Sequence, residues 1–81
     1  MASEDDANKV RQEHGRDLLK MGAHAVGVEE GKNHGQQGWV VVAHVAPGAK
    51  VDLPSSFSHS TKGGKVEVPV VVVRSKPYSL E

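Results

Sequence analysis

The segment W-V-V-V-A-H-V at residues 39–45 constrains the fold of this chain more than any other feature. It is apolar at every position but one, and Gly38 precedes it while Pro47 and Gly48 follow it. A strand with one exposed face alternates apolar and polar residues, whereas a nearly unbroken apolar run is typical of a strand buried on both faces. Residues 39–46 are therefore predicted to form a central strand that the rest of the chain covers.

Two further strands and one helix are expected around this central strand. Residues 23–29 and 65–74 are rich in small or β-branched side chains and predict strands that pair with it. Residues 3–21 predict a helix, because apolar residues recur along them at spacings of three or four. Ser3 is a suitable N-cap for this helix and Gly22 a suitable terminator.

These elements predict an α+β domain in which one N-terminal helix packs on a three-stranded, mainly antiparallel sheet. The expected order is helix, strand, strand, long loop, strand, with the loop at residues 47–64, a polar tail at residues 75–81 and all 81 residues in one domain. Fourteen valines against four leucines and no isoleucine favour a sheet-rich core. The reason is that a branched Cβ packs well on a pleated surface and loses rotamer freedom in a helix.

Charge and composition argue against several classes of function. The formal net charge is zero and the basic residues of the second half are scattered singly, so no nucleic-acid-binding stripe is expected. No run approaches the roughly 18 apolar residues of a membrane span, and the acidic N-terminal segment is unlike a secretory signal. The sequence has no cysteine and hence no disulfide framework, and we expect a cytoplasmic protein.

The connection at residues 30–38 leaves the register of the first two strands open. If it closes symmetrically, three cross-strand pairs share one face of the sheet, namely His24 with His44, Val26 with Val42, and Val28 with Val40. The helix is then expected on the other face, where small residues allow close packing; this face carries Ala25, Gly27, Trp39, Val41 and Ala43. A slip of one residue would exchange the faces.

One helix covers only one face of a sheet, so the second face needs another cover. Either the long loop or a second subunit could supply it, and an uncovered valine patch beside free strand edges promotes association. We therefore expect a homodimer, with a heterologous protein partner as the alternative. The expected interface consists of apolar side chains from all three strands, with Trp39 as an anchor if it lies at the rim: Val26, Val28, Trp39, Val40, Val42, Val71 and Val73.

His24 and His44 are the candidates for a ligand-binding or pH-sensitive pair. Neutral imidazole is a common metal ligand, and two neighbouring rings would repel each other when both are protonated. Two ligands do not make a metal site, and no acidic residue is expected beside them. The interpretation as partly buried histidines at a sheet rim or subunit interface is therefore preferred, and neither a metal nor a cofactor is predicted.

Two further segments have a superficial similarity to functional motifs. Residues 27–33 contain glycines and Lys32, but the spacing and the following strand do not match a phosphate-binding loop. The serine-rich segment 55–61, with His59 and Asp52, offers nominal nucleophile and base residues without a nucleophile elbow to expose a serine. No catalytic residue is predicted, and the chain is not expected to be an enzyme.

Several segments together resemble the small domain that precedes the trypsin-like catalytic domain in some bacterial proteins. They are A-V-G-V at residues 25–28, the valine-rich residues 38–45, Leu53-Pro54, and G-K-V-E-V-P-V at residues 64–70. The sequence departs from that pattern at Glu29, where a glycine is usual. The resemblance implies an accessory or inhibitory role beside a protease and carries over no catalytic residue. The expected architecture is also analogous to cystatin-like inhibitors, whose Gln-x-Val-x-Gly loop is missing here.

The function expected from the sequence is that of a small, non-catalytic, self-associating protein-interaction module. Two alternatives remain open. One is a small-ligand or metal-binding protein that uses His24 and His44, and the other is an accessory or inhibitory domain that acts with a protease.

Overall fold

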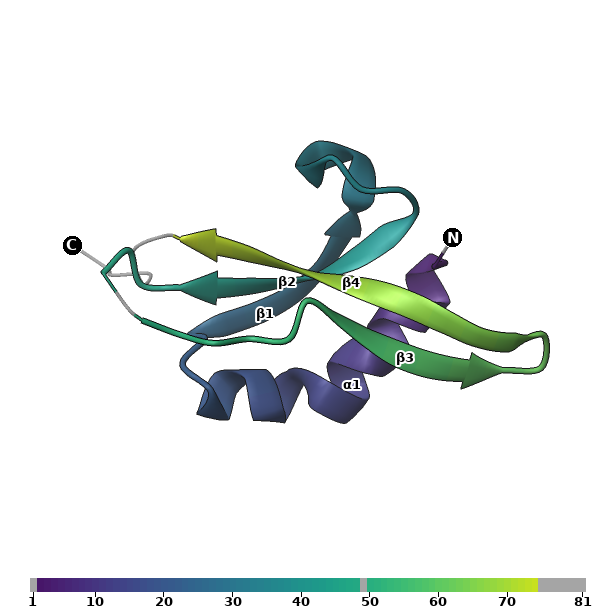
Figure 1. The fold of residues 1–81 in the computed structure, drawn as a ribbon, viewed down its shortest axis with the longest axis horizontal. Helices are drawn as coiled ribbons and strands as arrows, with labels where there is room; N and C mark the ends of the chain where they lie inside the picture. The colour runs from purple at the N-terminus through teal and green to yellow at the C-terminus, as the bar shows by residue number, and fades with distance from the viewer. Residues whose placement is uncertain (1, 49, 75–81) are drawn as a thin grey trace.

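The computed structural model of the chain describes residues 2–48 and 50–74 (Figure 1). One helix packs against one face of a sheet, so the predicted α+β class is confirmed. The predicted tail at residues 75–81 lies outside the described residues. The elements in chain order are α1 (Glu4–Lys20), β1 (Ala25–Glu30), the short 3-10 helix η1 (Gly31–His34), β2 (Trp39–Val45), β3 (Ser56–Thr61) and β4 (Gly64–Arg74).

Local sequence signals account for both ends of α1. The hydroxyl of Ser3 accepts a hydrogen bond from the Asp6 amide at 3.1 Å, and the Asp6 carboxylate accepts one from the Ser3 amide at 3.0 Å. This reciprocal capping box satisfies two amides that the first turn of a helix leaves without partners. At the other end Gly22 has a φ of 120°, a conformation that glycine adopts without strain.

The sheet has four strands and mixed pairing, in the order β1-β2-β4-β3. β1 pairs with β2 and β3 with β4 in antiparallel fashion, whereas β2 and β4 are parallel. The prediction of three mainly antiparallel strands is therefore wrong in its details. The additional strand, β3, lies within the predicted loop at residues 47–64 and forms a hairpin with β4 around residues 62–63.

The register of β1 and β2 differs by one residue from the symmetric closure expected from the sequence. Ala25 lies opposite His44 and Val26 lies opposite Ala43. η1 occupies part of the connection, so that the chain does not close as a symmetric loop. Since side chains alternate between faces, the slip moves Val26 and Val28 onto the face that α1 covers.

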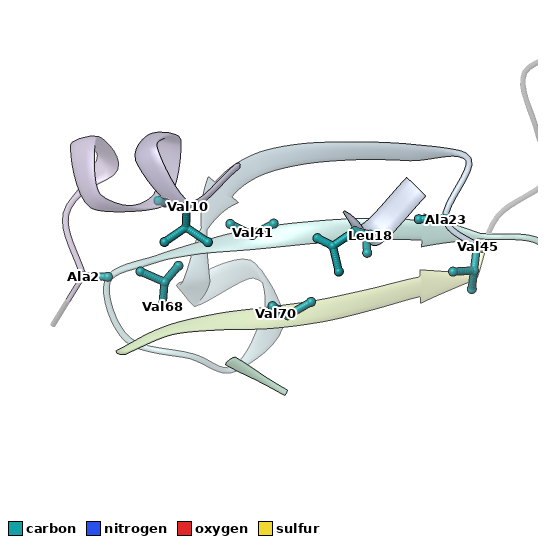
Figure 2. Packing of buried hydrophobic residues seen from close by; sticks show 10 residues of the cluster. Ala2, Val10, Leu18, Ala23, Val41, Val45, Val68 and Val70 are labelled. Carbon is teal, nitrogen blue, oxygen red and sulfur yellow. The ribbon is translucent and has the colours of Figure 1, made fainter. Parts of the chain in front are cut away.

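The core lies between α1 and this face of the sheet (Figure 2). Val10 and Leu18 of the helix meet Val41 of β2 and Val68 of β4, and all four are buried. The helix therefore covers the face of β2 that the sequence predicted. The chain between β2 and β3 also packs here, because its apolar side chains join the same cluster; these are Val51 and Leu53.

β4 changes its neighbours along its length. Residues 64–69 pair with β3, and residues 70–74 pair with β2. The β3–β4 hairpin consequently extends beyond the rest of the sheet (Figure 1), and the molecule is elongated, with extents of 46 × 24 × 21 Å. None of the helices formed by residues 2–48 and 50–74 has the length and apolar character needed to cross a membrane.

Candidate interaction surfaces

The face of the sheet opposite α1 carries four of the predicted interface residues. Val40 and Val42 lie on it from β2, and Val71 and Val73 lie on it from β4, because Val42 is opposite Val71. Val40 and Val42 have 0% exposed surface, however, whereas Val71 and Val73 are partly exposed. Any contact on this face would therefore come from β4 more than from β2.

The remaining predicted interface residues lie on the other side of the sheet. Val26, Val28 and Trp39 all pack against the core cluster beneath α1. Val26 and Val28 were expected at the interface because a symmetric register was assumed, and the structure has a register shifted by one residue. Trp39 was expected on the helix face, as an interface anchor only if it lay at the rim. Their position supports the core and leaves them little surface for a partner.

The second half of β4 presents an edge to which no strand pairs within the described part of the chain. The Val70 amide donates to the Ser55 carbonyl at 2.9 Å, on the side where β3 lies. Backbone groups alternate in direction along a strand, so the amide and carbonyl of Val72 point to the same side as those of Val70. β3 pairs no further than Pro69, and the Val72 side chain is 40% exposed.

His24 and His44 lie close together despite the shifted register. Their ring centroids are 6.3 Å apart with an interplanar angle of 35°. The His24 amide also donates to the His44 carbonyl at 2.8 Å. Among the residues of known placement, no three histidine, cysteine or acidic side chains gather into a group that could hold a metal ion. The geometry brings the predicted pair together without adding a third ligand.

The serine-rich segment forms β3, and alternation divides its polar groups between the two faces of the sheet. Ser56 and Ser58 donate from one face to the carboxylate of Glu67, at 2.8 and 2.5 Å. These hydrogen bonds, that of Ser58 first, hold the pKa of Glu67 below its usual value. His59 points to the other face, where its Nε2 lies 3.9 Å from the Asp6 carboxylate. The serines and the histidine are thus separated by the sheet.

A further contact ties β3 to the helix. The ring of Phe57 stacks on His14 with centroids 4.2 Å apart and planes within 5° of parallel. Residues 55–61 were expected to form part of a loop, so neither this stack nor the Glu67 contacts were predicted. The signal that could have revealed them is the alternation of serine with Phe57, His59 and Thr61, followed by the turn-forming Lys62 and Gly63.

Comparison with protein-family models, with curated protein sequences and with solved structures finds no significant match to this chain. The resemblance to the small domain that precedes trypsin-like catalytic domains therefore stays a prediction. The functional argument depends on the surfaces described above.

Proposed function

We propose that this chain is a small, non-catalytic protein-interaction module that associates with a second copy of itself through the outer edge of β4. The observation that carries the proposal is the uncharged run V-V-V-V at residues 70–73, which borders an edge that no strand of the described residues pairs with. Natural sheets usually protect such edges with charged side chains, proline or a covering element. Val72 is 40% exposed and lies on this edge between Pro69 and Arg74, where the run 70–73 contains no charged residue or proline and no described strand covers it.

Antiparallel pairing of two β4 edges about a twofold axis at Val72 would give the outward backbone amides and carbonyls of this edge hydrogen-bond partners. The outward amide of Val72 in each copy would donate to the carbonyl of Val72 in the other copy. Valines would face valines, and Arg74 would lie opposite Val70, so no like charges would oppose each other. Because the same surface is used by both copies, the contact closes on itself and produces a dimer instead of a fibre.

The placement of the polar side chains supports a non-catalytic role. Catalysis by a serine nucleophile requires a hydroxyl within hydrogen-bond reach of a base. The only base within reach of Ser56 and Ser58 in the described hydrogen bonds is the exposed Glu67 carboxylate, whose lowered pKa makes it a weak one, and His59 lies across the sheet from them. Ser56 and Ser58 therefore act as structural hydrogen-bond donors.

The proximity of His24 and His44 favours a second candidate function, the binding of a small ligand or metal ion. Replacing both residues by alanine distinguishes the two proposals. Self-association through β4 predicts that the double variant keeps the molecular mass of the wild type in solution. Loss of a bound metal or ligand from the purified protein, with the mass unchanged, would instead support the second candidate.

The self-association proposal is tested by light scattering after size exclusion over a range of protein concentrations. We expect the mass to approach twice the chain mass of 8.6 kDa as concentration rises. Val72→Lys should return the protein to a monomer, because a charged side chain would be brought beside its copy at the twofold axis. Met21→Lys is the matched control, since Met21 is 47% exposed at the end of α1. It lies next to the start of β1 in the chain, and β2 separates β1 from β4 in the sheet.

A monomer at every concentration, or a dimer that Val72→Lys leaves intact, would overturn the proposal. Circular dichroism of both variants would show that each keeps its fold.

A further inference from the structure

A groove of about 530 Å³ lies between α1 and β1, on the side of the sheet away from β3. The helix contributes Arg11, Arg16 and Leu19 to its lining, and the β1 segment contributes Ala25 and Val26. Leu19 is 48% exposed, the largest exposed fraction among the large hydrophobic side chains that the structure describes. The groove thus combines exposed apolar surface with two guanidinium groups.

β1 is an end strand of the sheet and offers backbone groups along this groove. The Gly31 amide donates to the Gly38 carbonyl in register with the β1–β2 pairing, so alternation directs the amides and carbonyls of Val26, Val28 and Glu30 to the outer edge. β1 ends the strand order, and no described strand pairs with its outer edge. An extended chain can approach the edge there.

The charge of α1 is divided between its two sides. Arg11 and Arg16 line the groove beside β1, and none of the described acidic residues joins them in its lining. The acidic Glu13 and Asp17 lie near His14, whose ring stacks on β3. The helix is therefore basic towards β1 and acidic towards β3, which favours a negatively charged occupant of the groove.

The acidic end of β1 does not cancel this preference. Glu29 accepts a hydrogen bond from His34 at 3.1 Å, and Glu30 lies 3.2 Å from the Lys32 ammonium group. Both carboxylates thus have partners within η1, at the end of β1 opposite to His24 and Ala25.

We infer that this groove binds an extended, acidic peptide segment of another protein, which adds to the sheet as a strand beside β1. The outward backbone groups of β1 would hold the peptide main chain, and Arg11 and Arg16 would pair with its carboxylates. An apolar side chain of the peptide would pack against Leu19 and Val26. β1 and β4 are not neighbours in the sheet, so this site is separate from the proposed self-association edge and is open in either state.

Fluorescence anisotropy with a labelled eight-residue peptide of alternating valine and glutamate tests the inference. The wild-type protein should bind this peptide and should not bind the same peptide with lysine in place of glutamate. The double variant Arg11→Glu/Arg16→Glu should weaken binding by about tenfold or more, because two ion pairs are replaced by repulsion. Lys62→Glu/Lys65→Glu is the matched control, with an equal change in net charge on the β3–β4 hairpin, and should bind like the wild type.

A backbone variant separates strand addition from simple charge attraction. Val28→Pro removes an amide that points outward, which an edge strand tolerates, and should weaken peptide binding while the circular dichroism spectrum is retained. Val28→Ala, which keeps this amide, is its control and should bind like the wild type. The inference is overturned if the lysine peptide binds equally well, if the arginine variant binds unchanged, or if Val28→Pro has no effect. Equal or tighter arginine-dependent binding of single-stranded DNA or of phosphatidylserine vesicles would also overturn it in favour of a general polyanion site.

The self-association proposal can fail independently of this inference. Val72→Lys should bind the acidic peptide with wild-type affinity, whatever its mass in solution.

Discussion

The side chain of Asp6 contacts both the start of α1 and β3, the strand that was not predicted. Its carboxylate accepts from the Ser3 amide, as the spacing of the two residues predicted, and also lies 3.9 Å from His59 of β3. The pKa of Asp6 is lowered, first by the hydrogen bond from the Ser3 backbone and then by the Ser3 hydroxyl, His59 and Lys9. The cap could be read from local sequence, whereas the contact with His59 depends on the tertiary fold.

Replacing Asp6 by asparagine should make folding stability less dependent on pH. Because the pKa of Asp6 is lower in the folded state, its ionised form stabilises the protein above the pKa of the unfolded chain, about 3.9. That stability is lost as the pH falls through the folded-state pKa. At pH 7 we expect Asp6→Asn to lower the unfolding free energy by about 1 kcal/mol, and the difference from wild type should shrink below about pH 4. Urea denaturation between pH 2.5 and pH 7 measures this.

Asp5→Asn serves as the control, because Asp5 is exposed in the same helical turn and the capping box is formed by Asp6. A difference between Asp6→Asn and wild type that stays constant over the whole pH range would contradict the role assigned to the Asp6 carboxylate.

At the scale of elements, the sequence predicted those segments whose side chains follow a clear period. The helix and the three valine-containing strands lie within a few residues of their predicted bounds, because the pattern of buried side chains specifies each of them locally. β3 was missed because serine and threonine at alternate positions resemble a solvated loop. Its strand conformation depends on pairing with β4, where Phe57 lies opposite Val68.

The strand register could not be predicted for a different reason. The connection between β1 and β2 contains η1, and a connection of that length does not specify a single closure. A shift of one residue moved Val26 and Val28 from the expected interface to the core. The parallel pairing of β2 with β4 could not be predicted from the sequence either. It depends on the path of the chain between β2 and β3, which packs on the core through Val51 and Leu53.

The crossing of that chain over the end of α1 predicts a strong requirement for glycine at position 22. A Cβ atom at Gly22 would lie 2.6 Å from Cγ1 of Val51, and the φ of 120° disfavours any side chain. Gly22→Ala should therefore lower the unfolding free energy by about 1–3 kcal/mol. Gly48→Ala is the matched control, because a Cβ atom there would meet nothing within 4 Å.

Thermal denaturation of the two alanine variants checks this expectation. Gly48→Ala should be neutral or stabilising by up to about 1 kcal/mol, since it reduces the freedom of the unfolded chain. Equal destabilisation of both variants would show that the contact between Gly22 and Val51 does not hold the connection in place.

At the scale of the whole molecule, the two faces of the sheet differ because α1 packs on only one of them. α1 and the connection that carries Val51 and Leu53 pack on one face, and the strand order leaves β1 and β3 at the ends of the sheet (Figure 1). From the sequence, a dimer was expected because valines on one face of the sheet had no cover. The structure moves that argument to an edge, because Val40 and Val42 are already fully buried while Val72 is exposed.

The most direct test of the self-association proposal is amide hydrogen exchange at Val72, measured by NMR at a low and a high protein concentration. The amide of Val71 points towards β2 and provides an internal reference that should be protected at both concentrations. If two copies pair through β4, the Val72 amide should exchange quickly in the dilute sample and become protected in the concentrated one. Equally rapid exchange of Val72 at both concentrations, with Val71 protected throughout, would contradict pairing at this edge.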